Sequence, residues 1–298
     1  MLITEAVRGE GGRLFILKDK LPYYFMEEKY PSLGNLMPRD VVSREEWQWM
    51  KEGYQIYLDM RHLEKHIQYT KLRGVIEDCK RFLKIDPTKE AIPVEPGIHY
   101  FMGGIWVDRN HRTSMKYLYA AGECACQYHG ANRLGGNSLL GAIYGGKIAA
   151  RSVMKDPEYV TEKTPGMRKN DQKIDDIKTC DIGESWLIMQ TILKNGLGII
   201  REEKTIQQAI LKMDELFKKV TGTYDKAALE TENQTLQNCI ILGKAMLVCA
   251  KERKESRGAH TRSDYMQESK KYQKQTIARY NNEEILIDFR KAGELYED

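Results

Sequence analysis

The chain has 298 residues and a formal net charge of +4, from 47 Lys and Arg against 43 Asp and Glu. This length allows one large domain or two to three smaller ones. The weak positive charge suits an anionic substrate but does not favour a nucleic-acid partner, because the lysines are scattered rather than gathered in one block. No apolar run is long enough to cross a membrane and no signal peptide opens the chain, so we expect a soluble globular protein.

The six cysteines show no spacing typical of a disulfide framework, which favours a reducing, cytoplasmic compartment. Cys124 and Cys126 lie close in sequence to His129. Structural zinc sites usually use paired C-x-x-C ligands, and the sequence contains no such pair. We therefore expect no metal site.

In the first third of the chain, alternating apolar residues predict strands, and apolar residues at helical spacing predict helices. The predicted strands are 2–4, 14–17 and 55–60, the predicted helices are 38–53 and 64–84, and a loop is expected over 21–37. In the last third, helical patterns over 183–220 and 227–254 predict a bundle. Alternating residues on either side of 281–282 predict a hairpin near the end of the chain.

The middle of the chain carries the strongest signals for a binding site. Strand character is expected over 99–107 and over 118–123, and the second segment ends in Gly122 and Glu123. An acidic residue at a strand end can accept hydrogen bonds from ribose hydroxyls. A glycine-bearing loop then leads into a small-residue helix with Asn137 or Ser138 as its expected N-cap. Such a helix start offers free N–H groups and a positive dipole end to an anion or an electron-rich ring.

Six blocks of this sequence resemble the flavoprotein subunit of succinate dehydrogenase and fumarate reductase, in the order of that family. The blocks are T-E-A-V-R-G-E-G-G (4–12), P-R-D-V-V-S-R (38–44), H-Y-F-M-G-G (99–104), L-Y-A-A-G-E-C (118–124), H-G-A-N-R-L-G-G-N-S-L-L (129–140) and E-S-R-G-A-H (255–260). The resemblance implies an α+β fold, as a fragment of a multi-domain flavoprotein. The implied parts are 1–95 in the substrate-capping domain, 96–155 as a returning part of the FAD-binding domain, a linker over 156–178, a helical domain over 179–257 and a tail with a hairpin over 258–298.

The resemblance also implies FAD as cofactor and hydride exchange between flavin N5 and a four-carbon dicarboxylate. Arg39 matches the residue that gives or takes the proton, and Glu5 and Arg8 match its proton relay. An arginine is a poor general acid by itself, so this role needs the relay as an outlet; a purely structural ion-pair network is the alternative, and both can hold.

The remaining matched positions bind substrate or cofactor. Arg133, His99 and Thr4 match residues that hold the substrate carboxylates. Glu123 matches the ribose contact, and Ser138 and Leu139 match flavin contacts at the helix start. The block at 255–260 is expected to be structural, packing back on the active-site region without a catalytic role.

The family's G-x-G-x-x-G motif, which holds the FAD pyrophosphate, does not occur in these 298 residues. We therefore expect the chain to correspond to the later part of the family's chain and to bind FAD weakly or not at all alone, as a split-gene product, a late start or a remnant. A non-catalytic fragment that keeps only partner-packing surfaces is one alternative. The other is an L-aspartate oxidase-like flavoprotein, which Met102 and the block at 255–260 disfavour.

The partners that the resemblance implies are an iron–sulfur subunit and a membrane anchor subunit. Through them the chain is expected to lie on the inner face of the cell membrane, on the cytoplasmic side.

Overall fold

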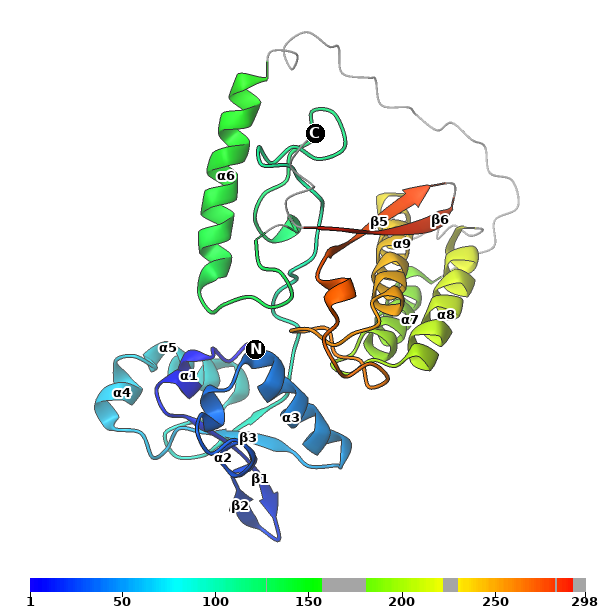
Figure 1. Ribbon diagram of the computed structural model, residues 1–298. Coiled ribbons are helices and arrows are strands. Elements are labelled where there is room, and N and C mark those ends of the chain that lie inside the picture. The colour runs from blue at the N-terminus through cyan, green and yellow to red at the C-terminus, as the bar shows by residue number, and fades with distance from the viewer. Residues whose placement is uncertain (127, 157–180, 222–229, 282, 292–298) are drawn as a thin grey trace. The chain divides into compact units, whose positions relative to one another are not determined.

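The computed structural model describes residues 1–126, 128–156, 181–221, 230–281 and 283–291. The chain divides into two compact units, Met1–Tyr100 (unit 1) and Phe101–Asp298 (unit 2) (Figure 1). The linker predicted over 156–178 lies outside the described residues except for Asp156. Helices and strands both contribute to the described part, which confirms the mixed fold class.

Unit 1 is built on a four-stranded antiparallel sheet with the strand order β2-β1-β3-β4. The strands are β1 (Arg13–Lys18), β2 (Leu21–Tyr23), β3 (Ile56–Asp59) and β4 (Ile92–Val94). Leu14 pairs with Leu58, which in turn pairs with Ile92, so these three buried side chains form one row across the sheet. This row anchors the hydrophobic core of the unit.

The helical segments of unit 1 are short except for one. They are α1 (Ala6–Gly9), α2 (Phe25–Lys29), η1 (Gly34–Leu36), α3 (Arg39–Lys51), α4 (Lys65–Tyr69), α5 (Arg73–Asp78) and the π-helical turn η2 (Cys79–Leu83). Val7 of α1, Phe25 and Met26 of α2 and Val42 of α3 join the core of the sheet. The core therefore fixes α1 and α3, which carry the charged residues matched to the family, against one sheet.

Three expectations for unit 1 are wrong. Residues 2–4 form no strand, and β2 and α2 lie where a loop was expected over 21–37. The single helix predicted over 64–84 is broken into α4 and α5. The Thr70 hydroxyl donates to the His66 carbonyl at 2.6 Å, and Gly74 lowers helix propensity just beyond the break.

The first part of unit 2 is mostly irregular. The strands predicted over 99–107 and 118–123 are wrong, because these segments form only the isolated bridges Ile105↔Ala125 and Arg112↔Tyr119. His111 and Tyr117 have φ values of 63°, outside the extended range, so regular pairing cannot continue between them. A short 3₁₀ turn, η3 (Gly122–Cys124), then leads toward the long helix α6 (Asn137–Lys155).

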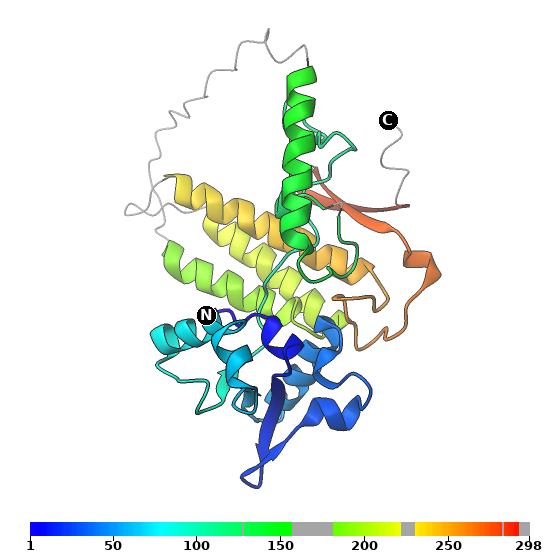
Figure 2. The same cartoon turned by 90° about the vertical axis from the view of Figure 1, so that its left-hand side faces the viewer.

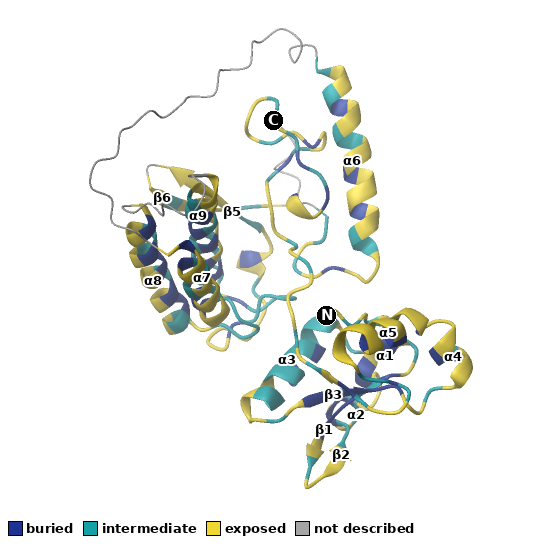
Figure 3. Cartoon of the chain, turned by 180° about the vertical axis from the view of Figure 1, so that it is seen from behind, coloured by how far each residue is buried: buried dark blue, intermediate teal, exposed yellow. Residues whose placement is uncertain are grey.

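Three helices form the bundle of unit 2, namely α7 (Ile182–Gly196), α8 (Glu203–Thr221) and α9 (Glu230–Glu252) (Figure 2). The buried face of α8 has the 3-4 spacing of an amphipathic helix, with Ile206, Ala209, Met213, Leu216 and Val220. Figure 3 shows these buried turns facing the neighbouring helices. A Cβ on Gly196 would lie 2.6 Å from Ala209 Cβ and from Leu247 Cδ2, so the helices meet closely at this glycine.

The hairpin β5 (Gln275–Asn281) and β6 (Glu284–Arg290) follows the short turn η5 (Lys270–Tyr272). Its register runs from Gln275↔Arg290 to Asn281↔Glu284, so the predicted hairpin is present and Asn281, expected in the turn, is the last paired residue of β5. Tyr272 and Phe289 pack edge to face with ring centroids 5.3 Å apart. Among the described helices of the chain, none is both long and apolar enough to cross a lipid bilayer.

Candidate active site

Glu5 places its carboxylate between two arginines of unit 1. Arg39 is the first residue of α3, after Pro38 as N-cap, and its Nε donates to Glu5 Oε2 at 2.5 Å. Its Nη2 contacts the same oxygen. On the other side, Arg8 Nη2 donates to Glu5 Oε1 at 3.0 Å. One carboxylate thus bridges both guanidinium groups, so the structure brings together the three residues matched to the family's proton relay.

Arg8 is held on its far side by Asn35. The Arg8 Nη1 donates to the Asn35 backbone carbonyl, and the Asn35 side chain accepts from the Leu14 N–H at 2.9 Å. Asn35 Nδ2 donates to Glu27 Oε1 at 2.8 Å, so this buried amide ties η1, β1 and α2 together. Sequence reasoning missed Asn35, because it placed the residue in a loop. The only available signal was the pairing of Gly34 with Asn35, which is typical of a tight turn.

Glu46 lies two helical turns after Arg39 on α3, and no sequence pattern singles it out. Burial raises the pKa of this carboxyl to about 7, against the lowering effect of the Arg8 charge. Near neutral pH the protonated form is therefore well populated. This places a second carboxyl group within the electrostatic influence of Arg8.

The other two predicted residues of unit 1, Thr4 and His99, lie outside helices and strands. Thr4 Oγ1 accepts the Ala6 N–H at 3.3 Å at the start of α1, and this bond leaves the hydroxyl proton for another acceptor. His99 is exposed in the segment that follows β4. Their meeting with Arg133, which belongs to unit 2, stays a prediction.

Arg133 is buried in the loop that precedes α6. Its Nη1 donates to the Leu134 carbonyl at 3.3 Å. Burial and the positive charge of Arg133 lower the pKa of His129. The neutral imidazole is therefore favoured beside the arginine, which remains the cation of this loop.

The glycines of α6 have two different environments. A Cβ on Gly141 would lie 3.4 Å from His129 Nε2, and one on Gly145 would overlap the Tyr128 hydroxyl at 2.0 Å. The space beside these two glycines is therefore filled by the rings of His129 and Tyr128 and is not left for a flat ligand. Gly146 faces open space.

The N-terminus of α6 fits the edge of a flat redox ring. The expected N-caps, Asn137 and Ser138, are wrong, because Gly136 is the N-cap and adopts φ +78°, which favours glycine. Gly136 has no side chain that could cap the first turn, and the Asn137 N–H donates to the Leu134 carbonyl at 3.3 Å. The next N–H groups of the turn have no carbonyl partner within the helix and lie at the positive end of the helix dipole. Leu139 and Leu140 are exposed beside them. These N–H groups and apolar side chains suit the polar edge and the face of a flavin.

The Glu123 carboxylate can accept a further hydrogen bond from a ligand. The Phe101 N–H donates to Glu123 Oε1 at 2.9 Å, and Glu123 itself is exposed. Gly122 has φ +79°, and its Cβ position is 3.4 Å from Ala142 Cβ, so the turn lies directly on α6. A carboxylate beside the helix start fits the ribose of FAD.

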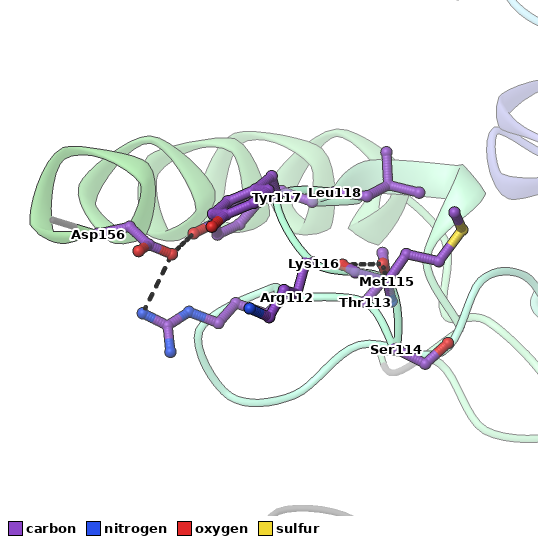
Figure 4. A pocket seen from close by; sticks show the side chains of 9 residues that line it. Arg112, Thr113, Ser114, Met115, Lys116, Tyr117, Leu118 and Asp156 are labelled. Carbon is purple, nitrogen blue, oxygen red and sulfur yellow. Dashed lines mark hydrogen bonds and ion pairs between the residues drawn. The ribbon is translucent and has the colours of Figure 1, made fainter. Parts of the chain in front are cut away.

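The hollow shown in Figure 4 measures about 440 Å³ and lies in the same unit. It is lined by residues 112–119 and by Asp156, which accepts a hydrogen bond from the Tyr119 hydroxyl at 2.9 Å. Arg112 Nη2 lies 3.7 Å from the same carboxylate oxygen, so this arginine already has a counter-ion within the hollow. None of the predicted site residues lines it.

Comparisons with known proteins identify the family of the chain. Residues 1–139 match the family described as FAD binding domain, and residues 187–293 match the fumarate reductase flavoprotein C-terminal family. The succinate dehydrogenase flavoprotein subunit of Bacillus subtilis is 35% identical over an alignment of 296 positions, which covers 89% of this chain and 50% of that protein. L-aspartate oxidase of Pyrococcus furiosus is 35% identical over 282 residues, covering 94% of this chain and 52% of that protein.

Solved structures give the same result. A quinol-fumarate reductase with menaquinol molecules has a TM-score of 0.85 at 28% identity, covering 98% of this chain and 57% of that chain. The chain spans about half the length of the curated relatives it matches. The matched domain and the flavoprotein relatives indicate FAD as cofactor. The chain therefore belongs to the family of succinate dehydrogenase and fumarate reductase flavoprotein subunits.

Proposed function

We propose that this chain forms the substrate side of a flavin-dependent oxidoreductase that interconverts succinate and fumarate. The observation that carries the proposal is the Glu5 carboxylate held between Arg8 and Arg39. Arginine gives up a proton poorly in isolation. A neighbouring carboxylate that is itself linked to a second guanidinium group offers a path by which the proton can be replaced. This arrangement is therefore what an arginine acid would require.

In this mechanism Arg39 delivers the proton to the substrate carbon when fumarate is reduced, and it takes the proton back in the other direction. Glu5 restores the proton to Arg39, and Arg8 restores it to Glu5. Bound FAD supplies the hydride acceptor or donor. Glu123 would hold its ribose, and Ser138 and Leu139 at the start of α6 would face its ring.

A dicarboxylate needs cationic or hydrogen-bonding groups at both ends. We assign Arg133 to one carboxylate as the principal clamp, with His99 and Thr4 as hydrogen-bonding partners of the substrate. The burial of Arg133 supports this role, because an arginine shielded from water binds an anion more strongly than an exposed one.

L-aspartate is the second candidate substrate, because one relative of similar identity is an L-aspartate oxidase. Aspartate carries an ammonium group at the carbon that would be oxidised. The residues assigned to the substrate, Arg133, His99 and Thr4, include no carboxylate that could pair with this ammonium group, and succinate has no such group to pair. Comparing turnover of succinate and aspartate by the same preparation separates the two activities.

We further propose that electrons pass to an iron–sulfur subunit and that a membrane anchor subunit holds the assembly on the inner, cytoplasmic face of the cell membrane. The support is the family of the chain, whose relatives are flavoprotein subunits.

The test is co-expression of this chain with a family segment that carries the G-x-G-x-x-G motif. We expect a yellow protein with succinate–dye reductase activity that Arg39→Ala abolishes. Arg44→Ala is the matched control, since it removes an arginine from the same helix that pairs with Asp40 instead of Glu5. A yellow protein without succinate or fumarate turnover would reject the proposal and favour either aspartate oxidation or a non-catalytic role.

A further inference from the structure

The loop that carries Arg133 is contacted by a tight turn from the end of the helical bundle. Ala259 N–H donates to the Ala131 carbonyl at 3.0 Å. Beside it, a Cβ on Gly258 would lie 2.4 Å from Ala131 O and 2.7 Å from Ala131 C. Both neighbours are backbone atoms, which cannot rotate away as the end of a side chain can. The approach of Gly258 to the loop is therefore possible only for glycine.

The backbone conformation of the turn also requires glycine at position 258. Arg257 N–H donates to the His260 carbonyl at 2.8 Å, and His260 N–H donates to the Arg257 carbonyl at 3.1 Å. These two bonds leave Gly258 and Ala259 as the two residues at the tip. Gly258 has φ +56°, in the left-handed region that glycine occupies at little cost.

The base of the turn is anchored by fully buried Glu255. Its Oε1 accepts from Arg257 Nε at 3.0 Å and from Arg253 Nη1, and its Oε2 accepts the Ser269 N–H at 2.9 Å. Hydrogen bonds from both arginines and from this amide lower the pKa of Glu255, although burial opposes them. The carboxylate therefore stays ionised and holds the turn to the segment that follows it.

His260 locks the turn to the bundle from the other side. Arg201 Nη1 donates to His260 Nδ1 at 2.7 Å, so that nitrogen must be an acceptor. The ring proton then lies on Nε2, which donates to the Arg253 carbonyl at 2.9 Å. Burial and the nearby arginine charges lower the pKa of His260 to about 4, so this neutral form is kept across the physiological range. The tip thus projects from a rigid base.

The loop is also contacted by α6, where the ring of His129 lies against Gly141. These two contacts, with α6 and with the turn, restrict the backbone around Ala131. Arg133 follows two residues later, and its side chain is buried.

We propose that Gly258 and Ala259 are positioning residues, which hold the Ala131 backbone so that Arg133 presents its guanidinium group to the substrate. The assignment of Arg133 to the substrate rests on the proposed function, whereas the holding of the loop does not. The block at 255–260 thus serves the site through contact with the loop, without touching the substrate.

The first test uses hydrogen exchange on the 298-residue chain, read over residues 129–136. Gly258→Ala should raise exchange in this loop about tenfold, because the left-handed conformation and the overlap with Ala131 both oppose the closed state. Ala259→Pro removes the N–H without adding a Cβ at 258 and should give a rise of the same order. Gly53→Ala is the control, since Gly53 has φ +91° but open space around its Cβ position, and it should leave the loop unchanged.

Two outcomes of the exchange experiment would overturn the inference. One is unchanged exchange over residues 129–136 in both variants. The other is an equal rise in the loop and in α9, which would mean that the turn stabilises the bundle as a whole rather than the loop.

The second test uses steady-state kinetics of the chain completed with the G-x-G-x-x-G segment. Loosening the loop should raise the KM for succinate about tenfold while kcat changes less, because the substrate clamp rather than the proton relay is displaced. A fall in kcat at constant KM would contradict the positioning of Arg133. If the completed wild-type protein turns over neither succinate nor fumarate, the proposed function fails, and the exchange experiment still decides whether the turn holds the loop.

Discussion

Replacing Glu46 by glutamine should stabilise unit 1 at neutral and alkaline pH. Burial raises the pKa of Glu46 from its ordinary value of 4.5 to about 7. A carboxyl whose pKa is raised in the folded state favours folding while it is protonated, and this advantage is lost as the pH rises from 4.5 through 7. The difference of about 2.5 pH units corresponds to about 3 kcal/mol at pH 8.

Glutamine keeps the size and polarity of the protonated carboxyl at every pH. The free energy of unfolding of Glu46→Gln should therefore match that of the wild type near pH 4.5 and exceed it by about 3 kcal/mol at pH 8. Hydrogen exchange of the α3 amides, measured as a function of urea concentration, gives this difference in unfolding free energy within unit 1. Glu52→Gln, at the exposed C-terminal end of the same helix, is the control and should show no such pH dependence. Equal stability differences at pH 5 and pH 8 would refute the reasoning.

Three further changes test unit 2 by urea unfolding. Hydrogen bonds from Arg262 lower the pKa of Asp264 from 3.8 to about 2, so the ionised carboxylate contributes about 2 kcal/mol to the free energy of unfolding above pH 4, and this is lost as the pH falls toward 2. Asp264→Asn should remove this acid-dependent contribution, and an acid transition like that of the wild type would contradict it. Gly196→Ala should cost about 1–3 kcal/mol because its Cβ overlaps two helices, whereas Gly146→Ala, in open space, should cost nothing. Glu255→Ala leaves two arginines without their buried counter-ion and should cost about 3–5 kcal/mol; a cost below 1 kcal/mol would argue against the anchored turn.

Regular periodicity made the long helices predictable. The apolar residues of α6 and α8 recur at helical spacing, and both helices form where the pattern places them. The prediction over 64–84 failed although the spacing was good, because the Thr70 hydroxyl and Gly74 weaken the helix at one point. The segment over 118–123 failed for another reason. Its apolar residues are typical of a buried strand, but a strand also needs a partner along its length, which a pattern cannot supply.

Part of the candidate site could be predicted because its members are local. Glu5 and Arg8 are three residues apart, so one turn of helix brings them together. Arg39 is 34 residues away from Glu5, and only the family resemblance linked the two. Glu46 could not be predicted, because a glutamate on a helix usually faces water, and only tertiary packing shields this one enough to raise its pKa. The contact of Gly258 with Ala131 likewise depends on two segments that are distant in sequence.

We propose that Arg39, as the proton donor, contacts the same diacid that His99 and Arg133 bind. The most direct measurement is the affinity of the completed, FAD-loaded protein for malonate, a dicarboxylate too short to be oxidised in this way. The change in flavin absorbance on titration with malonate reports the binding. We predict that Arg39→Ala, His99→Ala and Arg133→Ala each weaken binding about tenfold or more, since each removes a hydrogen bond to a charged group. If any of the three variants binds malonate as tightly as the wild type, that residue does not contact the diacid and the proposed site is wrong.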